Sequence, residues 1–312
     1  MWKTLEKAPR GLHPVYSRLL SQIDDESRIE IAEIVRWMAQ AQEPLTTRQL
    51  SNALYPDTKH RKEADEAFGR IRDLVTDSYP LMKLTKDKDW NDWDGRPRNK
   101  NNNYVVLYHR SIADYLLEIN VHDADLDPKI KTFHITPEKT HYKIAKRCLD
   151  DLHARFEHLE DIYYRSELNW KLEADRPGFA VWFKYARSHW PTHARLCGEE
   201  SLKFIKPRHA FFADESTFRT AWWLEYGPKG TFKDRKKMED HQGSMLGALH
   251  SYSDFGLLPM IHTLLEENLN VEGYVNDDRG SHTALAYATQ YDQSEAAGLL
   301  IRNGASLVNN GQ

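Results

Sequence analysis

Two stretches near the C-terminus resemble each other: GALHSYSDFGLLPMIHTLLEENLNV (247–271) and TALAYATQYDQSEAAGLLIRNGASL (283–307). They align at an offset of 35–36 residues. Each contains a short helix, a turn, a second helix with a Leu-Leu pair, and a polar break. A period of this length is typical of helical hairpins that stack on one another and bury a shared core. The sequence therefore predicts two stacked repeats over 243–312.

Upstream of the repeats, residue spacing predicts helices followed by a β-hairpin. Thr46 is expected to cap a short helix that runs through Leu54. Two apolar runs, LMKLT (81–85) and YVVLYH (104–109), flank a polar loop and predict a hairpin with a long tip. Helices followed by a hairpin are the element order of a winged helix, which we place at 26–120. The apolar residues at helical spacing before the hairpin are Leu12, Tyr16, Leu19, Leu20, Ile23, Ile31, Ile34, Val35, Met38, Ala67, Ile71, Leu74 and Val75.

A helical connector is expected over 121–242, between the winged helix and the repeats. Its second helix should end at Pro191, because a proline inside a helix removes a backbone hydrogen bond. A further aromatic helix in the stretch 211–230 should be stopped by Gly227–Pro228 and should cover the first repeat with residues 216–226. The apolar stripes of the first two connector helices are Ile144, Cys148, Leu149 and Leu152, and Phe179, Trp182, Phe183 and Ala186.

Composition limits the class of protein. The 312-residue chain has 40% apolar residues, 29% charged residues and a formal net charge of −4, which is a globular profile. A near-neutral charge gives no general attraction to nucleic acid or to anionic membranes. Two cysteines are too few for a disulfide framework and favour a reducing compartment. The N-terminus lacks the apolar core of a signal peptide, so we expect a cytoplasmic protein with no membrane partner.

The stretch VVLYHRSIADYLLE (105–118) holds the residue types of a hydrolase triad, namely His109, Ser111 and Asp114. The members of a triad usually come from separate elements, and no G-x-S-x-G elbow is present. The alternative is a capping box, in which Ser111 caps a helix and Asp114 occupies its third position. We favour the capping box and expect no catalytic residue.

His189, His193 and Cys197 share one helical face by spacing, which is a pattern that metal ligands can adopt. Because Pro191 should interrupt that helix and no fourth ligand follows nearby, we interpret these residues as helix-end positions. The sequence predicts no metal and no cofactor.

The same stretch, 105–118, resembles the segment that follows the nucleotide-binding domain in fungal NACHT-type signal-transduction NTPases. APRGLHPVYSRLLSQI and IVRWMAQAQEPLTTRQLSNAL resemble the helix leaving that domain and the first part of the winged helix. FKYARSHWPTHAR resembles the helical region behind it, and the two repeats resemble ankyrin repeats. The resemblance implies a mainly α fold: an N-terminal helix over 1–25, a winged-helix domain, a helical connector and a short ankyrin-repeat array. It also implies a NACHT-associated role in signal transduction through protein–protein interaction.

Several departures limit what the resemblance implies. The chain begins where the NTPase domain of the family would end, and it has no G-x-x-x-x-G-K-[ST] loop. The nearest fragment, YGPKGT (226–231), lacks the spacing that cradles phosphates, so we expect no nucleotide partner. The first repeat has Ser251-Tyr252-Ser253 where ankyrin repeats carry small apolar residues, and the second has Ala286 in place of the usual histidine.

A winged helix also suggests DNA binding, which requires basic residues on the reading helix and the wing. The helix TTRQLSNAL (46–54) offers only Arg48. Residues 86–100 contain five basic and four acidic side chains, which nearly cancel. The sequence therefore disfavours nucleic acid as a partner, and a winged-helix DNA-binding protein is the least favoured interpretation.

The sequence thus predicts a non-enzymatic adaptor or regulatory module that binds another protein through ankyrin repeats. The main alternative is a fragment of a NACHT-type immune or incompatibility receptor that functions only with its nucleotide-binding domain. A more distant alternative is an enzyme with a cleft in the helical region, for which no convergent catalytic residues are found. The partner should contact the turn tips and first-helix ends, which are free of packing in ankyrin arrays. The expected protein-binding residues are Asp254, Phe255, Asp277, Asp278, Arg279, Ser281, Gln290 and Tyr291.

Overall fold

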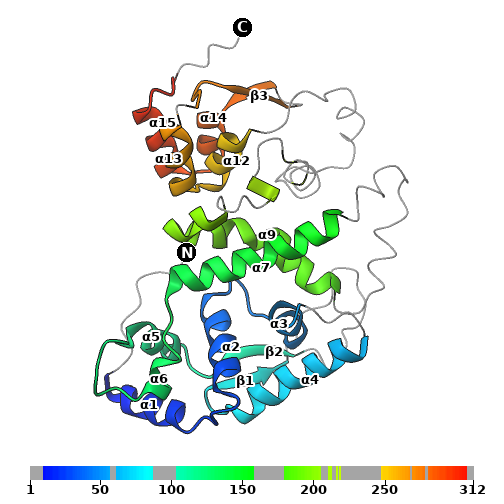
Figure 1. The fold of residues 1–312 in the computed structure, drawn as a ribbon, viewed down its shortest axis with the longest axis vertical. Helices are drawn as coiled ribbons and strands as arrows, with labels where there is room; N and C mark the ends of the chain where they lie inside the picture. The colour runs from blue at the N-terminus through cyan, green and yellow to red at the C-terminus, as the bar shows by residue number, and fades with distance from the viewer. Residues whose placement is uncertain are drawn as a thin grey trace. The chain divides into compact units, whose positions relative to one another are not determined.

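The computed structural model describes residues 10–56, 61–86, 103–157, 179–204, 210–212, 216, 218, 247–267, 269–277 and 280–307. The fold is mainly α-helical, as the sequence predicts (Figure 1). The chain divides into two compact units: Met1–Thr140 with Trp170–Trp182, and His141–Asn169 with Phe183–Gln312. Within the described ranges, no helix is both long and apolar enough to cross a membrane.

Short helices and one hairpin make up the described part of the first unit. Their order is η1 (Arg10–Leu12), α1 (His13–Ser21), α2 (Arg28–Gln40), α3 (Thr47–Leu54), α4 (Arg61–Asp77), β1 (Met82–Thr85), β2 (Tyr104–Leu107), α5 (Ser111–Glu118) and α6 (Pro128–Lys131). The helices α7 (Pro137–Glu157) and α9 (Phe179–Leu196) follow, and the boundary between the units falls within both of them.

The predicted hairpin is confirmed. Strands β1 and β2 pair antiparallel, with Met82 opposite Leu107 and Thr85 opposite Tyr104. Its expected tip lies outside the described residues. A single β-bridge joins Thr46 to Tyr104 and adds a third extended segment to the hairpin. Thr46 also caps α3, as predicted, because its side chain accepts from the backbone of Gln49 while the Gln49 side chain accepts from the backbone of Thr46.

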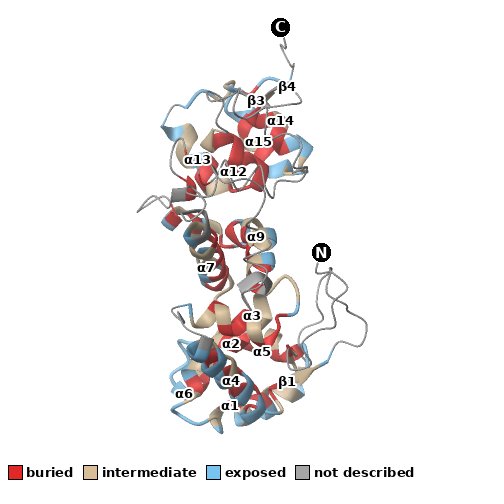
Figure 2. Ribbon diagram, turned by 90° about the vertical axis from the view of Figure 1, so that its right-hand side faces the viewer, coloured by how far each residue is buried: buried red, intermediate tan, exposed pale blue. Residues whose placement is uncertain are grey.

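The core of the first unit is formed by the apolar faces that the helical spacing predicts. On α2 these are Ile31, Ile34 and Val35, which are buried. Figure 2 shows buried positions in red on the helices of this unit. Trp37 on the same helix is also buried, and its ring centroid lies 5.7 Å from that of Trp182. The contact between these two rings therefore joins α2 to the start of α9 within the core of the first unit.

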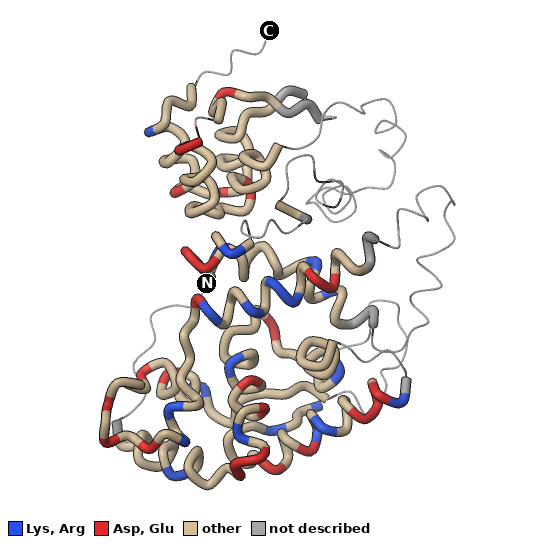
Figure 3. The backbone as a smooth tube through the Cα atoms, viewed as in Figure 1, with Lys and Arg blue, Asp and Glu red and all other residues tan. Residues whose placement is uncertain are grey.

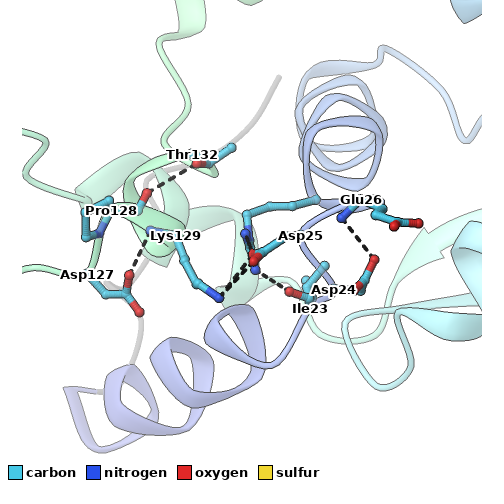
Figure 4. A network of polar contacts seen from close by, with 9 residues as sticks. Ile23, Asp24, Asp25, Glu26, Asp127, Pro128, Lys129 and Thr132 are labelled. Carbon is cyan, nitrogen blue, oxygen red and sulfur yellow. Dashed lines mark hydrogen bonds and ion pairs between the residues drawn. The ribbon is translucent and has the colours of Figure 1, made fainter.

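A polar network holds the turn before α2 against α6 (Figure 4). Asp25 accepts from Arg28 and lies 3.0 Å from the ammonium group of Lys129. Both cations favour the ionised carboxylate, so the pKa of Asp25 is lowered, mainly by its hydrogen bond to Arg28. Asp127 caps α6 by accepting from the backbone of Lys129 at 2.9 Å. The same lysine thus takes part in both the helix cap and the ion pair.

Helix α9 corrects one prediction. We expected it to end at Pro191, but it continues to Leu196. Trp190, His193 and Ala194 are buried on either side of the proline. Burial of these side chains offsets the backbone hydrogen bond that proline removes, so packing overrides the local preference.

The C-terminal part of the second unit consists of two helix pairs joined by a hairpin. The first pair is α12 (Ala248–Phe255) and α13 (Leu258–Glu266), and the second is α14 (Ala284–Gln290) and α15 (Ser294–Arg302). Between them, β3 (Tyr274–Asp277) pairs antiparallel with β4 (Gly280–Thr283). Corresponding helices start 36 residues apart, at 248 and 284 and at 258 and 294. Helix α12 packs on α14, and α13 packs on α15, so the predicted repeat is a repeated helix pair.

Both helix pairs turn in the same way. Gly256 ends α12 with a φ of 66°, and Asp292 follows α14 with a φ of 57°. The next residue then donates back to the first helix: Leu257 to Tyr252 at 2.9 Å, and Gln293 to Ala288 at 2.8 Å. Both turns therefore use a left-handed residue, which is comfortable for glycine and costly for most others.

Replacing Gly256 with alanine is expected to destabilise the second unit by about 1–3 kcal/mol, because a non-glycine residue is strained at positive φ. The added Cβ would also meet the Gln293 side chain and lie 3.3 Å from Cδ of Arg195. Urea unfolding measures the loss. Asp292→Gly is the matched control, since it introduces the residue that tolerates positive φ at the corresponding turn, and it should not destabilise the unit. Equal destabilisation by both changes would contradict the shared turn geometry.

Candidate functional site

Two of the expected protein-binding residues are not exposed. Asp254 is 5% exposed and Phe255 is 8% exposed, so the expectation that these two lie on a free surface is wrong. The ring centroid of Phe255 lies 4.9 Å from that of Trp190, and the planes are inclined at 73°. Phe255 is therefore part of the core between α9 and α12.

The layer that covers the first repeat comes from α9 and from two 3-10 helices, η2 (Gly198–Phe204) and η3 (Ala210–Phe212). The hydroxyl of Tyr252 donates to the carbonyl of Phe212 at 3.3 Å, and η2 packs against α13. Most of 216–226, which we expected to provide this cover, lies outside the described residues. In the described part, the covering side chains are therefore Trp190, Phe211 and Phe212.

Gln290 and Tyr291 lie at the end of α14, in the turn where the sequence predicts contact with a partner protein. Gln290 is exposed at the end of α14, Tyr291 is half-buried, and Asp292 is exposed beside them. We call Gln290, Tyr291 and Asp292 the turn surface. At its edge, Arg195 donates to the side-chain oxygen of Gln293 at 3.1 Å, which links the end of α9 to the second turn. That these residues contact a partner stays a prediction.

The remaining expected contacts belong to the hairpin. Asp277 ends β3 and Ser281 lies in β4, so both have described backbones within the paired strands. Asp278 and Arg279 lie outside the described residues. The hairpin joins the two helix pairs, and β4 leads directly into α14 and packs against it.

The cluster at Ser111 differs from the predicted capping box. Ser111 is the first residue of α5, while Arg110 occupies the cap position with helical angles and makes no side-chain cap. The Ser111 hydroxyl instead lies 2.5 Å from the hydroxyl of Tyr16 and 2.6 Å from Nδ1 of His109. The capping box is therefore wrong, because a tertiary contact to α1 and the adjacent histidine engage the serine side chain.

The direction of these hydrogen bonds follows from the histidine. Nδ1 of His109 accepts from the backbone N–H of Ser111 at 3.3 Å, so this nitrogen carries no proton. Ser111 then donates to His109, and Tyr16 donates to Ser111. A second hydroxyl pair, Ser17 with Tyr115 at 2.7 Å, joins the same two helices.

A serine next to a histidine could act as a nucleophile if a third group oriented the base. No hydrogen bond among the described residues joins Asp114 to His109, and Ser111 is buried. The arrangement therefore fits the attachment of α1 to α5 better than it fits a catalytic triad.

Ser111→Ala is expected to destabilise the first unit by about 1–3 kcal/mol, because the buried Tyr16 hydroxyl loses its acceptor. The control is Ser21→Ala, which removes an exposed hydrogen bond to the carbonyl of Arg18 in the same helix as Tyr16 and should change stability far less. Thermal unfolding and an esterase assay check this expectation. Esterase activity that disappears in Ser111→Ala at an unchanged melting temperature would contradict it.

The residues of the disfavoured metal face, His193 and Cys197 among them, have other partners in the structure. Nδ1 of His193 lies 2.8 Å from Nδ1 of His141, and its Nε2 lies 2.8 Å from the hydroxyl of Tyr185. Cys197 donates to the carbonyl of Ala194 at 3.0 Å, and burial raises the pKa of its thiol to about 12. The described residues contain no group of three side chains that could hold a metal ion.

Helix α3, which would be the reading helix in the disfavoured DNA-binding interpretation, is engaged within the first unit. Arg48 lies 3.9 Å from the carboxylate of Asp65, and its guanidinium lies 5.0 Å above the ring of Phe68. Both partners belong to α4, along which acidic and basic residues alternate (Figure 3). The described part of this region therefore presents a surface of mixed charge. Binding of DNA phosphates requires a mainly basic surface. The wing lies outside the described residues.

Comparison with known protein families, with curated proteins and with solved structures finds no match for this chain. The functional conclusion for this chain therefore depends on its own residues and their geometry.

Proposed function

We propose that this chain is a non-enzymatic adaptor or regulatory module that binds another protein through two ankyrin-type repeats. The observation that carries this proposal is the pair of helical hairpins in the second unit, displaced by 36 residues and joined by the hairpin β3–β4. The shared left-handed turn and the stacking of α12 on α14 also support it. Stacked helical hairpins of this kind serve mainly as protein-binding scaffolds.

A winged-helix module in the first unit is the second part of the proposal. Its support is the element order α2, the bridge at Thr46, α3, α4 and the hairpin β1–β2. The engagement of Arg48 by α4 favours a module that packs against its neighbours over one that reads DNA. In this proposal the module acts as a spacer, and the protein works in the cytoplasm.

The partner surface comprises the turn surface, at the end of α14, and the hairpin, which leads into the start of α14. The side chains of Gln290 and Asp292 are exposed, so a partner can reach their polar groups. Tyr291 adds a half-buried aromatic ring, the kind of side chain that often contributes most to protein interfaces. Asp277 ends the strand of the hairpin. The surface therefore suits a partner with hydrogen-bonding groups around an apolar contact.

A second candidate is the regulatory part of a NACHT-type NTPase. It is favoured by the α1–α5 contact, in which Tyr16 and Ser17 dock on Ser111 and Tyr115 at the stretch that resembles this family. In that case the partner of the chain is a nucleotide-binding domain, whose state the chain would regulate.

Affinity capture with the intact chain tests the proposal. We expect the double variant Gln290→Lys with Tyr291→Ala to lose the bound protein at least tenfold relative to wild type. The matched control is Tyr108→Ala, which removes an exposed tyrosine of the first unit. Equal retention by wild type, double variant and control would contradict the proposed surface. A captured NTPase domain would favour the second candidate.

A further inference from the structure

Three side chains in the second unit form a buried relay that the proposed function does not use. Tyr185 and His193 come from α9, and His141 comes from α7. The hydroxyl of Tyr185 lies 2.8 Å from Nε2 of His193, and Nδ1 of His193 lies 2.8 Å from Nδ1 of His141. Tyr185 and His193 are fully buried, and His141 is 5% exposed. We call these three residues the histidine relay.

Only one hydrogen atom fits between the Nδ1 atoms of His141 and His193. At 2.8 Å, one Nδ1 must donate and the other must accept, so both rings can be neutral with all their contacts satisfied. If both rings gained a proton, two N–H groups would point at each other across this distance. A single added proton can make His193 a donor to both neighbours, but it places a charge in a dry core.

Among the described residues, no carboxylate is shown to offset such a proton. The ionisable groups that act on His193 are His141 on α7 and His189 on its own helix, and the phenol of Tyr185 contacts its other nitrogen. Burial contributes most, and both histidines act in the same direction, so the pKa of His193 is held well below its usual value. No carboxylate of the described residues is among the groups that shift it.

The relay is also placed to affect the repeats. His193 follows Trp190 by one helical turn, and the Trp190 ring contacts Phe211 and Phe255 at 4.5 and 4.9 Å. A second buried histidine, His250, lies in α12 itself and donates to the carbonyl of Gly273 at 3.0 Å. Burial lowers the pKa of His250 to about 4. Charging His193 therefore disturbs the packing of α9 on α12, whereas charging His250, whose ring lies against Tyr287, disturbs the packing of α12 on α14.

We propose that the histidine relay makes the second unit acid-sensitive, so that α7, α9 and α12 lose their mutual packing below about pH 6 while the first unit stays folded. The device goes beyond partner binding, because it would release the repeat surface in an acidic environment. In the described part of the first unit, no histidine is buried to the same extent, which is why we expect the two units to respond differently.

The sign of the effect follows from proton linkage. His193 and His250 are neutral in the folded unit, and their folded pKa values lie below those of the unfolded chain. Stability is therefore fully present above the unfolded value of about 6.5 and is lost as the pH falls below it. Each such group lowers the ratio of folded to unfolded unit by about tenfold per pH unit, so the two together approach about 100-fold.

Hydrogen exchange on the intact chain between pH 7.5 and 5.0 tests the proposal, with labelling times scaled to the intrinsic exchange rate. We expect protection to fall in α7, α9 and α12 but not in α2 and α4. His193→Gln, which keeps one donor and one acceptor, should remove about tenfold per pH unit of this dependence. The matched control is His262→Gln, which removes an exposed histidine of the same unit and should leave the dependence unchanged.

Three results would overturn the proposal: constant protection down to pH 5, equal loss in both units, or an unchanged pH dependence in His193→Gln. If that variant does not fold at pH 7.5, exchange of the imidazole C2 hydrogens in the wild type decides instead. His193 should then titrate well below the ordinary histidine value in the folded chain, because burial disfavours its charged form. Titration of His193 near the ordinary value would refute the relay.

Discussion

Replacing Trp190 with alanine is expected to lower the free energy of unfolding of the second unit by about 3–5 kcal/mol. The Trp190 side chain is fully buried and contacts the rings of Phe211, Phe212 and Phe255, with centroid distances of 4.5, 6.1 and 4.9 Å. Its removal leaves a cavity between α9 and α12 that neighbouring helices cannot fill without moving. Since domains are stable by only about 5–15 kcal/mol, this single change should expose much of the repeat region.

The control for Trp190→Ala is Leu196→Ala, in the same helix but 43% exposed, which should cost far less. Hydrogen exchange in α12 and α13, followed in increasing urea, reports the difference. If the two variants unfold at the same urea concentration, Trp190 does not hold the first repeat to α9.

A second large effect is expected for Trp37→Ala, this time in the first unit. Trp37 is buried against Trp182, and its indole N–H donates to Glu33 at 3.3 Å. Loss of the ring should again cost about 3–5 kcal/mol, because the core between α2 and the start of α9 is left unfilled. Hydrogen exchange in α2 and α4 measures the effect.

Ile29→Ala is the matched control for Trp37→Ala, because Ile29 lies in the same helix and is 73% exposed. It should leave the first unit within about 0.5 kcal/mol of wild type. Comparable destabilisation by the two substitutions would contradict the assignment of Trp37 to the core.

Features with a local cause could be predicted from the sequence. The cap at Thr46 depends on residues three positions apart, and the hairpin β1–β2 depends on two apolar runs around a polar loop. The repeated helix pair was predictable because similar residues recur at corresponding positions about 36 residues apart. Each of these depends on spacing along the chain, which the sequence displays directly.

Features that depend on tertiary contacts could not be predicted in the same way. Phe255 looked like a free turn residue because nothing near it in sequence shows that Trp190 covers it. Ser111 looked like a helix cap, but its hydroxyl bonds to Tyr16, 95 residues earlier. Pro191 looked like a helix end, yet burial on both sides carries α9 past it.

The histidine relay was missed for a related reason. His141 and His193 are 52 residues apart and lie on different helices, so a ligand pattern along one helix includes His193 but not His141. One signal was present: His141 precedes Ile144, Ala145 and Cys148 at helical spacing, on the face that is buried in α7. A histidine on an apolar stripe needs a buried hydrogen-bond partner. His193 on α9 is that partner.

A hydrogen-exchange footprint of the captured complex tests whether the proposed partner surface is the one that the partner contacts. The intact chain, free and bound to its captured protein, is compared peptide by peptide. We expect new protection at the end of α14 and the turn surface (289–293) and in the hairpin β3–β4, with α2, α4 and β1–β2 unchanged. Protection confined to the first unit, with the turn surface and the hairpin exchanging as in the free chain, would contradict the claim.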